Sequence, residues 1–96
     1  MREWKLDIGG DEWAVQFVAP SRIPKTLVKG KLEQTWGRCI QKTHTIQVAN
    51  NLKPEDETLV LGHEIAHARC WDLDEEAVEE LAEAINAAFW RSVNAK

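Results

Sequence analysis

Hydrophobic and polar residues alternate along four short stretches in the first half of the chain. Trp4 to Ile8 and Glu12 to Ala19 each place apolar side chains at every second position, and a glycine-rich turn separates them. Thr35 to Ile40 and His44 to Ala49 alternate in the same way on either side of a short polar turn. A period of two is the pattern of a half-buried strand. The first half therefore predicts four strands in two antiparallel hairpins.

The segment between the two hairpins has no clear period. Pro20 to Pro24 contains two prolines in five residues, which suits neither a helix nor a central strand. Lys25 to Glu33 is compatible with a short helix or with a loop, and Gly30 argues against a long helix. The chain contains five Trp residues, and we expect them to supply much of the core, with Trp36 as the largest buried side chain of the third strand.

The second half changes to a helical pattern. The first helix is expected from Pro54 to about Arg69, because proline and the acidic residues after it suit the positive end of a helix. Asp74 is a suitable N-cap for a second helix from about Glu75 to Ser92. The apolar stripe expected to face the core consists of Val78, Leu81, Ala82, Ile85, Ala88 and Phe89. The face expected in solvent carries Glu76, Glu80, Glu83 and Asn86.

Together these patterns predict one α+β domain over residues 1–96. A small antiparallel sheet of about four strands would pack on the first helix, and the second helix would fold back towards the first. The net charge of −4 and the lack of a basic cluster argue against a nucleic-acid partner. No apolar run approaches the roughly 20 residues of a membrane span, and the N-terminus lacks the apolar region of a signal peptide. We therefore expect a cytoplasmic protein with no membrane partner, in which both cysteines stay reduced.

The first helix contains the sequence His63-Glu64-Ile65-Ala66-His67, an H-E-x-x-H motif. Residues four apart project from one face of a helix, so His63 and His67 can bind one zinc ion from that face. Glu64 lies about 100° round from His63. It can therefore flank the metal and take a proton from a water molecule whose pKa the metal has lowered. The expected cofactor is Zn²⁺.

A motif of five letters with two free positions also occurs by chance on helices. Here the surrounding residues favour a metal site over a coincidence. Leu59, Ile65 and Ala68 are apolar and indicate a largely buried helix, whereas the small residues Gly62 and Ala66 leave room around the metal. An acidic second helix that follows within ten residues offers carboxylates for a further ligand.

A catalytic zinc ion needs a third protein ligand. No third histidine follows the motif at the spacing of the three-histidine zinc enzymes, and His44 lies upstream on a predicted strand. Cys70 is a weaker candidate than a carboxylate from the second helix. At about 100° per residue, Glu75 lies on the margin of the apolar stripe, where it can reach inwards. Glu79 lies on the same margin one turn later, and Glu76 remains a third choice.

The stretch from Trp36 to Ile85 resembles the small gluzincin-type metallopeptidases of the ImmA/IrrE and minigluzincin kind, which are common in bacteria, archaea and phages. The resemblance is carried by the hairpin that ends in Thr45 to Val48, by Glu57 to Ala68 around the motif, and by Glu75 to Ala82. It implies a zincin-like fold in which the second helix supplies the third ligand from an E-x-x-A/V setting. Glu75 with Val78 fits that setting.

The resemblance implies a zinc-dependent endopeptidase with Glu64 as general base and His63, His67 and Glu75 as metal ligands. An extended peptide or protein substrate is expected to pair with an exposed strand edge at His44 to Ala49. Many gluzincins stabilise the oxyanion with a Tyr or another His, but this chain has no Tyr. The residues left for that role are His44 and Arg69.

Three other functions stay open at this point. The similarity in size to minigluzincins allows a latent peptidase. A zinc-stabilised binding or regulatory module of the same fold, without catalysis, is the main alternative. A DNA-associated protease of the SprT kind has less support, because the chain is acidic and shows no zinc-ribbon cysteines.

Overall fold

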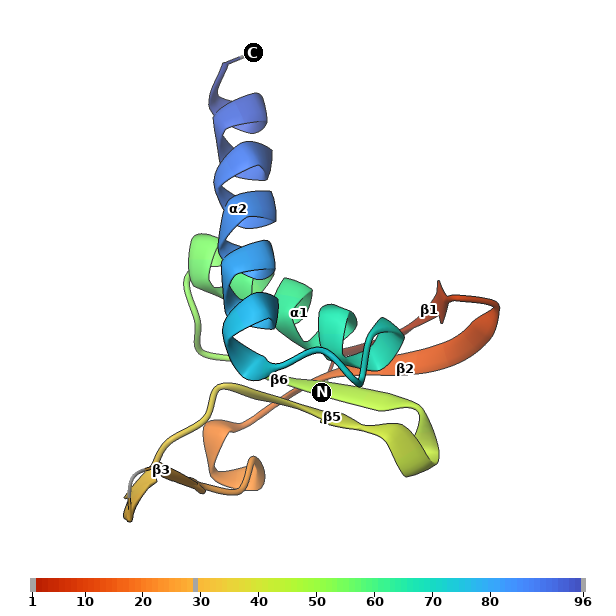
Figure 1. Cartoon of the computed structure of the whole chain (residues 1–96), viewed down its shortest axis with the longest axis vertical. Coiled ribbons are helices and arrows are strands. Elements are labelled where there is room, and N and C mark those ends of the chain that lie inside the picture. Colours follow the sequence, from red (N-terminus) through yellow and green to blue (C-terminus); the bar gives the residue numbers. More distant parts are fainter. Residues whose placement is uncertain (1, 29, 96) are drawn as a thin grey trace.

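A four-stranded sheet, a helix lying across it and a second helix projecting from the first make up the fold (Figure 1). The structure is a computed structural model that describes residues 2–28 and 30–95. The main elements in chain order are β1 (Arg2–Ile8), β2 (Asp11–Val18), β3 (Thr26–Val28), β4 (Lys31–Glu33), β5 (Gly37–Ile40), β6 (Thr45–Ala49), α1 (Pro54–Arg69) and α2 (Glu75–Asn94). Two 3₁₀ turns, Pro20–Arg22 and Gln41–Thr43, complete the chain. The α+β class is therefore confirmed.

The sheet is mixed, and the prediction of an antiparallel sheet is wrong. Its strand order is β1-β2-β6-β5. Both predicted hairpins form, but they join through a parallel pair in which Val15 lies opposite Ile46. After β2 the chain crosses to the far edge of the sheet, where it forms β5. It then turns back into β6, which lies between β5 and β2. As a result β6 enters beside β2 and runs in the same direction.

The strand order also corrects the position of the free edge. The stretch His44 to Ala49, expected to offer an exposed edge, contains β6, which is paired with β2 on one side and β5 on the other. The edge strands of this sheet are β1 and β5. Because α1 packs beside β5 and β6, the free edge close to the H-E-x-x-H helix belongs to Gly37–Ile40.

The ambiguous segment Lys25 to Glu33 forms a β-hairpin of two short strands, β3 and β4. Its turn includes Gly30, whose φ of 81° lies in the left-handed region that glycine adopts without strain. Side chains just after the hairpin attach it to the chain before it. Gln34 donates to the carbonyl of Pro20 at 3.4 Å, and Thr35 donates to the carbonyl of Pro24 at 2.8 Å. The two prolines thus mark the base of a separate hairpin.

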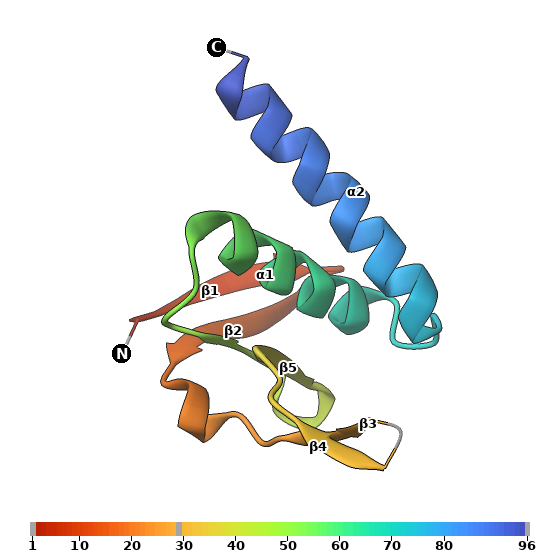
Figure 2. The same cartoon turned by 90° about the vertical axis from the view of Figure 1, so that its left-hand side faces the viewer.

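The core lies between α1 and one face of the sheet (Figure 2). Its buried residues are Ile8, Trp13, Val15, Phe17, Ile46 and Val48. Four residues of α1 pack against them: Val60, Leu61, Ile65 and Ala68. The helix is half-buried along most of its length, and Glu64 is its one buried residue. It is therefore less enclosed than its apolar residues predicted.

The tryptophans contribute less to the core than their number suggested. Trp13 is buried at 2% exposure, but Trp4, Trp36 and Trp71 are 39%, 43% and 75% exposed. The expected burial of Trp36 is therefore wrong. A single helix covers only the middle of this small sheet, so aromatic side chains near the edges stay in contact with water.

The second helix contacts the first through a narrow row of residues one turn apart. Val78 and Ala82 are buried in this contact. One turn further on, Asn86 accepts a hydrogen bond from Thr58 at 2.6 Å, and the indole of Trp90 donates to the same Thr58 hydroxyl at 2.8 Å. Asn86 also donates to the carbonyl of Glu55 at 3.2 Å. The prediction that Asn86 faces solvent is therefore wrong.

Most of the predicted apolar stripe of α2 does not reach the core. Leu81, Ile85 and Phe89 are 45%, 58% and 49% exposed, because they lie to one side of the row that contacts α1. Beyond that row α2 extends past α1 (Figure 1). Only Val78 and Ala82 of the stripe are buried. Neither helix of the described chain has the length and apolar character that crossing a bilayer requires.

The outer face of the sheet carries a ladder of polar side chains that crosses all four strands. The guanidinium of Arg38 donates to Gln47 at 2.6 Å, Gln47 donates to Gln16 at 2.9 Å, and Gln16 donates to Glu3 at 2.7 Å. These residues lie opposite one another in the strand register. The middle of the outer face is thus polar, and a small apolar cluster at its end is formed by Val18, Ile23 and Ala49. The face towards α1 is apolar.

Replacement of Gly37 by Ala is expected to destabilise the fold. A Cβ at this position would lie 2.5 Å from Cγ1 of Val60 and 3.2 Å from Cγ of Glu64, so β5 or α1 would have to shift. We expect a loss of about 1–3 kcal/mol in the free energy of unfolding, measured by urea titration. Gly62→Ala adds the same methyl group where no atom lies within 4 Å, and it should be neutral or stabilising by up to about 1 kcal/mol. Equal effects of the two changes would contradict this account of Gly37.

Candidate metal centre

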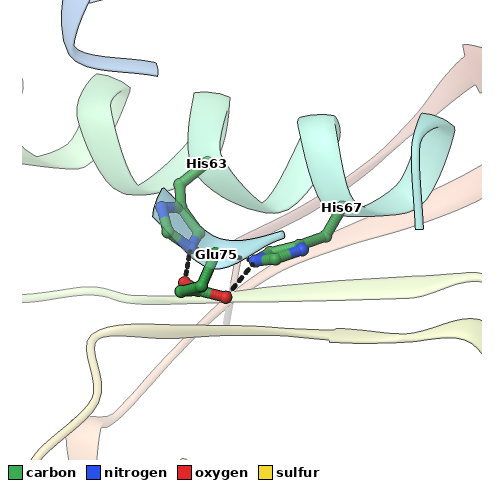
Figure 3. Close-up of side chains that lie close together, drawn as sticks. All are labelled: His63, His67 and Glu75. Atoms are coloured by element: carbon green, nitrogen blue, oxygen red, sulfur yellow. Dashed lines mark hydrogen bonds and ion pairs between the residues drawn. The ribbon is translucent and has the colours of Figure 1, made fainter. Parts of the chain in front are cut away.

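Two helices bring together His63, His67 and Glu75 (Figure 3). The histidines lie one turn apart on α1, and Glu75 is the first residue of α2. The connection between the helices is short, and Asp74 caps α2 as predicted by accepting a hydrogen bond from the backbone of Ala77 at 2.7 Å. The cap fixes where α2 begins, so its first side chain faces the two imidazoles.

The donor atoms of these three side chains converge on one point. Nε2 of His63 lies 2.7 Å from one carboxylate oxygen of Glu75, and Nε2 of His67 lies 3.1 Å from the other. The two Nε2 atoms are 3.0 Å apart. Two ligands at about 2.0–2.1 Å from a tetrahedral zinc ion lie roughly 3.3 Å from each other. A set of two imidazole nitrogens and one carboxylate oxygen at these separations fits a small divalent cation.

The structure distinguishes among the candidate carboxylates. Of the described residues, only His63, His67 and Glu75 form a group of three potential ligands, with donor atoms within 4.8 Å of one another. Glu76 and Glu79 do not belong to that group. Cys70 does not belong to it either, and its thiol is free. The amide of Gln41 donates to the backbone carbonyl of His67 at 3.0 Å and so links the sheet to the last turn of α1.

Glu64 extends from α1 towards β5, where a Cβ added at Gly37 would lie 3.2 Å from its Cγ. It is 8% exposed, and none of the hydrogen bonds among the described residues involves its carboxylate. Burial, and to a smaller extent the negative charge of Glu75, raise the pKa of Glu64 from 4.5 to about 7. A carboxyl group with a pKa in this range is suited to accepting and returning a proton near neutral pH.

A cleft of about 750 Å³ opens beside this group. One side is formed by α1 and the first turns of α2, and the other by the segment from the β3–β4 hairpin to β5. The lining residues are Thr26, Gln34, Thr35, Trp36, Gly37, Leu59, Val60, His63, Glu64, His67, Glu75, Glu79, Ala82 and Glu83. A ligand in the cleft can therefore contact the histidines, Glu64 and Glu75 together.

The two residues considered for oxyanion stabilisation lie elsewhere. The ring of His44 stacks on Trp13 with 4.7 Å between centroids and 12° between planes. The side chain of Arg69 lies next to Gly9, in the turn between β1 and β2, where an added Cβ would be 3.0 Å from it. Neither residue lines the cleft. The structure thus gives no support to either residue in that role.

The wall opposite the helices was missed in the sequence. Thr26 belongs to the segment Lys25 to Glu33, whose pattern favoured neither helix nor strand, Thr35 was expected to begin a strand, and Trp36 was expected in the core. Gly37 is the one local signal that could have marked this wall. A glycine at the start of a strand indicates a close approach of another element, and here that element is the H-E-x-x-H helix.

Comparisons of the chain with protein-family models, with curated proteins and with solved structures returned no match. The assignment of a function therefore depends on the residues and their geometry.

We expect one zinc ion per chain after reconstitution, measured by elemental analysis. His63→Ala, His67→Ala and Glu75→Gln should each weaken binding by more than about 100-fold, because each removes a direct ligand, whereas changes to residues behind a ligand cost about 10- to 100-fold. The matched control is Glu76→Gln, which removes the neighbouring charge of α2 and should keep the metal. Full zinc content in the Glu75 variant, or equal loss in the Glu76 variant, would contradict the proposed ligand set.

The thiol of Cys39 is expected to react slowly in the folded protein. Burial, and to a smaller extent the charge of Glu64, raise its pKa from 9.0 to about 11. Because only the thiolate reacts, a Cys70→Ser variant should be alkylated by iodoacetamide at about pH 8 on the order of 100-fold more slowly when folded than in denaturant. The added change Glu64→Gln should increase the rate in the folded state. A rate that does not respond to that change would argue against an ionised carboxylate next to Cys39.

Proposed function

We propose that this chain is a zinc-dependent metallopeptidase that hydrolyses peptide bonds in the 750 Å³ cleft. His63, His67 and Glu75 are the proposed ligands, and Glu64 is the proposed general base. The observation that supports this most strongly is that the three donor atoms converge beside Glu64, a largely buried residue that lines the same cleft. A purely structural metal site has no need for a carboxylate next to the metal but outside its ligand set.

The choice of zinc follows from the donor set. Two imidazoles and one carboxylate are the protein ligands of several catalytic zinc sites, in which the fourth position is left for water or substrate. When bound, zinc would lower the pKa of a water molecule towards about 7 and polarise the carbonyl of the peptide. The side chain of Glu75 lines the cleft and is 63% exposed, so water or a substrate can reach the site from solvent.

In this proposal Glu64 moves the proton. Its carboxylate lines the cleft next to His63 and His67, so it can accept a proton from the attacking water and pass it to the leaving amine. Packing between α1 and β5 restricts the side chain: a Cβ added at Gly37 would lie 3.2 Å from its Cγ.

The free edge of β5 supplies a means of holding an extended substrate. The backbone N–H of Ala49 donates to the carbonyl of Trp36 at 2.8 Å, which places Trp36 in a hydrogen-bonded position of the ladder. By the alternation of an antiparallel pair, the N–H and C=O of Gly37 then face away from β6. A peptide that adds a strand at this edge would lie alongside Glu64 and the histidines.

The decisive test is Glu64→Gln. The variant should keep one zinc ion per chain and lose peptide hydrolysis by about 10²- to 10⁴-fold in kcat, since the general base is removed while the ligands remain. Cleavage of a peptide library, followed by mass spectrometry, provides the assay, and a chelator should abolish cleavage by the unmodified chain.

Glu76→Gln serves as the control, because it removes a carboxylate from the same region but not from the cleft. Full activity of the Glu64 variant would eliminate this residue as the base. Stoichiometric zinc without cleavage of any library peptide by the unmodified chain would favour the alternative of a non-catalytic zinc module.

A further inference from the structure

Two further carboxylates line the cleft beyond the proposed metal ligands. Glu79 and Glu83 follow Glu75 at intervals of four residues on α2, and both line the cleft. Residues at this spacing lie on one face of a helix. None of the ion pairs among the described residues involves Glu79 or Glu83. Their charges therefore face the cleft without a protein partner in the part of the chain that the structure describes.

Among residues 2–28 and 30–95, no Lys or Arg lines the opposite wall of the cleft. On that wall the polar groups of Gln34 and Thr35 already bind the backbone carbonyls of Pro20, Thr35 and Pro24. Trp36 is 43% exposed and lines the cleft. An exposed indole face and free carboxylates are both favourable surroundings for an organic cation.

Glu64 adds a further negative group to the same cleft. The residue as a whole is 8% exposed, and its carboxylate makes no hydrogen bond among the described residues and lines the cleft. A divalent cation at the proposed site would offset the charges of Glu64 and Glu75. The charges of Glu79 and Glu83 would remain unbalanced, so the cleft would still attract a positive group after the metal is bound.

We infer that the cleft selects peptides that carry a Lys or Arg side chain close to the scissile bond, held by Glu79 and Glu83 and packed on Trp36. This inference rests on the proposed peptidase function. Glu79 and Glu83 are specificity-determining residues in this account and take no part in the chemistry. Both are exposed, so the expected preference is moderate and sensitive to salt.

The test uses quenched-fluorescent peptides that differ at one position, with Lys, the uncharged isostere norleucine, or Glu. Zinc-loaded protein should cleave the Lys peptide with a kcat/KM about 5- to 30-fold above that of the norleucine peptide, which corresponds to one or two exposed ion pairs with a cation–π contact. The Glu peptide should be the poorest substrate. Raising the salt concentration should reduce the difference between Lys and Glu.

The double variant E79Q/E83Q should bring the Lys and norleucine peptides close to equal rates and retain one zinc ion per chain. The matched control is E76Q/E80Q, which removes the same charge from α2 outside the cleft and should preserve the preference for Lys. Trp36→Leu should reduce the preference for Lys over norleucine in part. A preference that survives E79Q/E83Q, or that falls equally in the control, would overturn the inference.

The two proposals fail in distinguishable ways. Cleavage of all three peptides at equal rates would leave the peptidase function in place and overturn the selectivity. If the zinc-loaded chain cleaves none of them, the function fails, and the selectivity is then decided by fluorescence anisotropy of the same peptides. Tighter binding of the Lys peptide than of the norleucine peptide, lost in E79Q/E83Q, would still support a cleft for cationic peptides. Equal binding would overturn it.

Discussion

The packing of α1 on the sheet is the interaction on which the rest of the structure depends. Its apolar residues cover Val15, Ile46 and Val48, and in the described part of the chain α2 contacts mainly α1. The same packing directs Glu64 into the interface and His63 and His67 towards the cleft, because consecutive positions on a helix differ by about 100°. The approach of α1 to β5 is close enough that only a hydrogen atom fits at Gly37. The core and the candidate centre thus form as one unit.

The negative charges of two neighbouring glutamates impose a second constraint on the cleft. Glu64 and Glu75 lie near enough to each other that, besides burial, the charge of Glu75 raises the pKa of Glu64. Such an arrangement is unfavourable for the folded chain alone, and a bound cation would relieve it. Because Glu75 comes from α2 and the histidines from α1, a cation held by all three would also stabilise the contact between the helices. That contact is narrow, with Val78 and Ala82 as its buried residues on α2.

The sequence correctly predicted those features of the structure that depend on residues close together along the chain. The helix boundaries, the Asp74 cap and the reach of Glu75 towards the histidines all follow from the helical period, and the structure agrees with each of them. The parallel pairing of β2 with β6 could not be predicted, because alternation specifies which face of a strand is buried but not the direction of its neighbour. The exposure of Leu81, Ile85 and Phe89 was missed for a related reason. An apolar stripe indicates burial only where another element covers it, and α1 contacts the neighbouring row of Val78, Ala82, Asn86 and Trp90.

The polar ladder on the outer face of the sheet makes that face a poor surface for binding another layer of protein structure. Arg38, Gln47, Gln16 and Glu3 form a directed chain, with a cation at the donor end and a carboxylate at the acceptor end. A second layer placed on that face would have to remove water from four polar groups whose hydrogen bonds are already made, and it would gain little apolar contact in return. Apart from the small cluster of Val18, Ile23 and Ala49, burial in the sheet is therefore concentrated on the side where the helices lie.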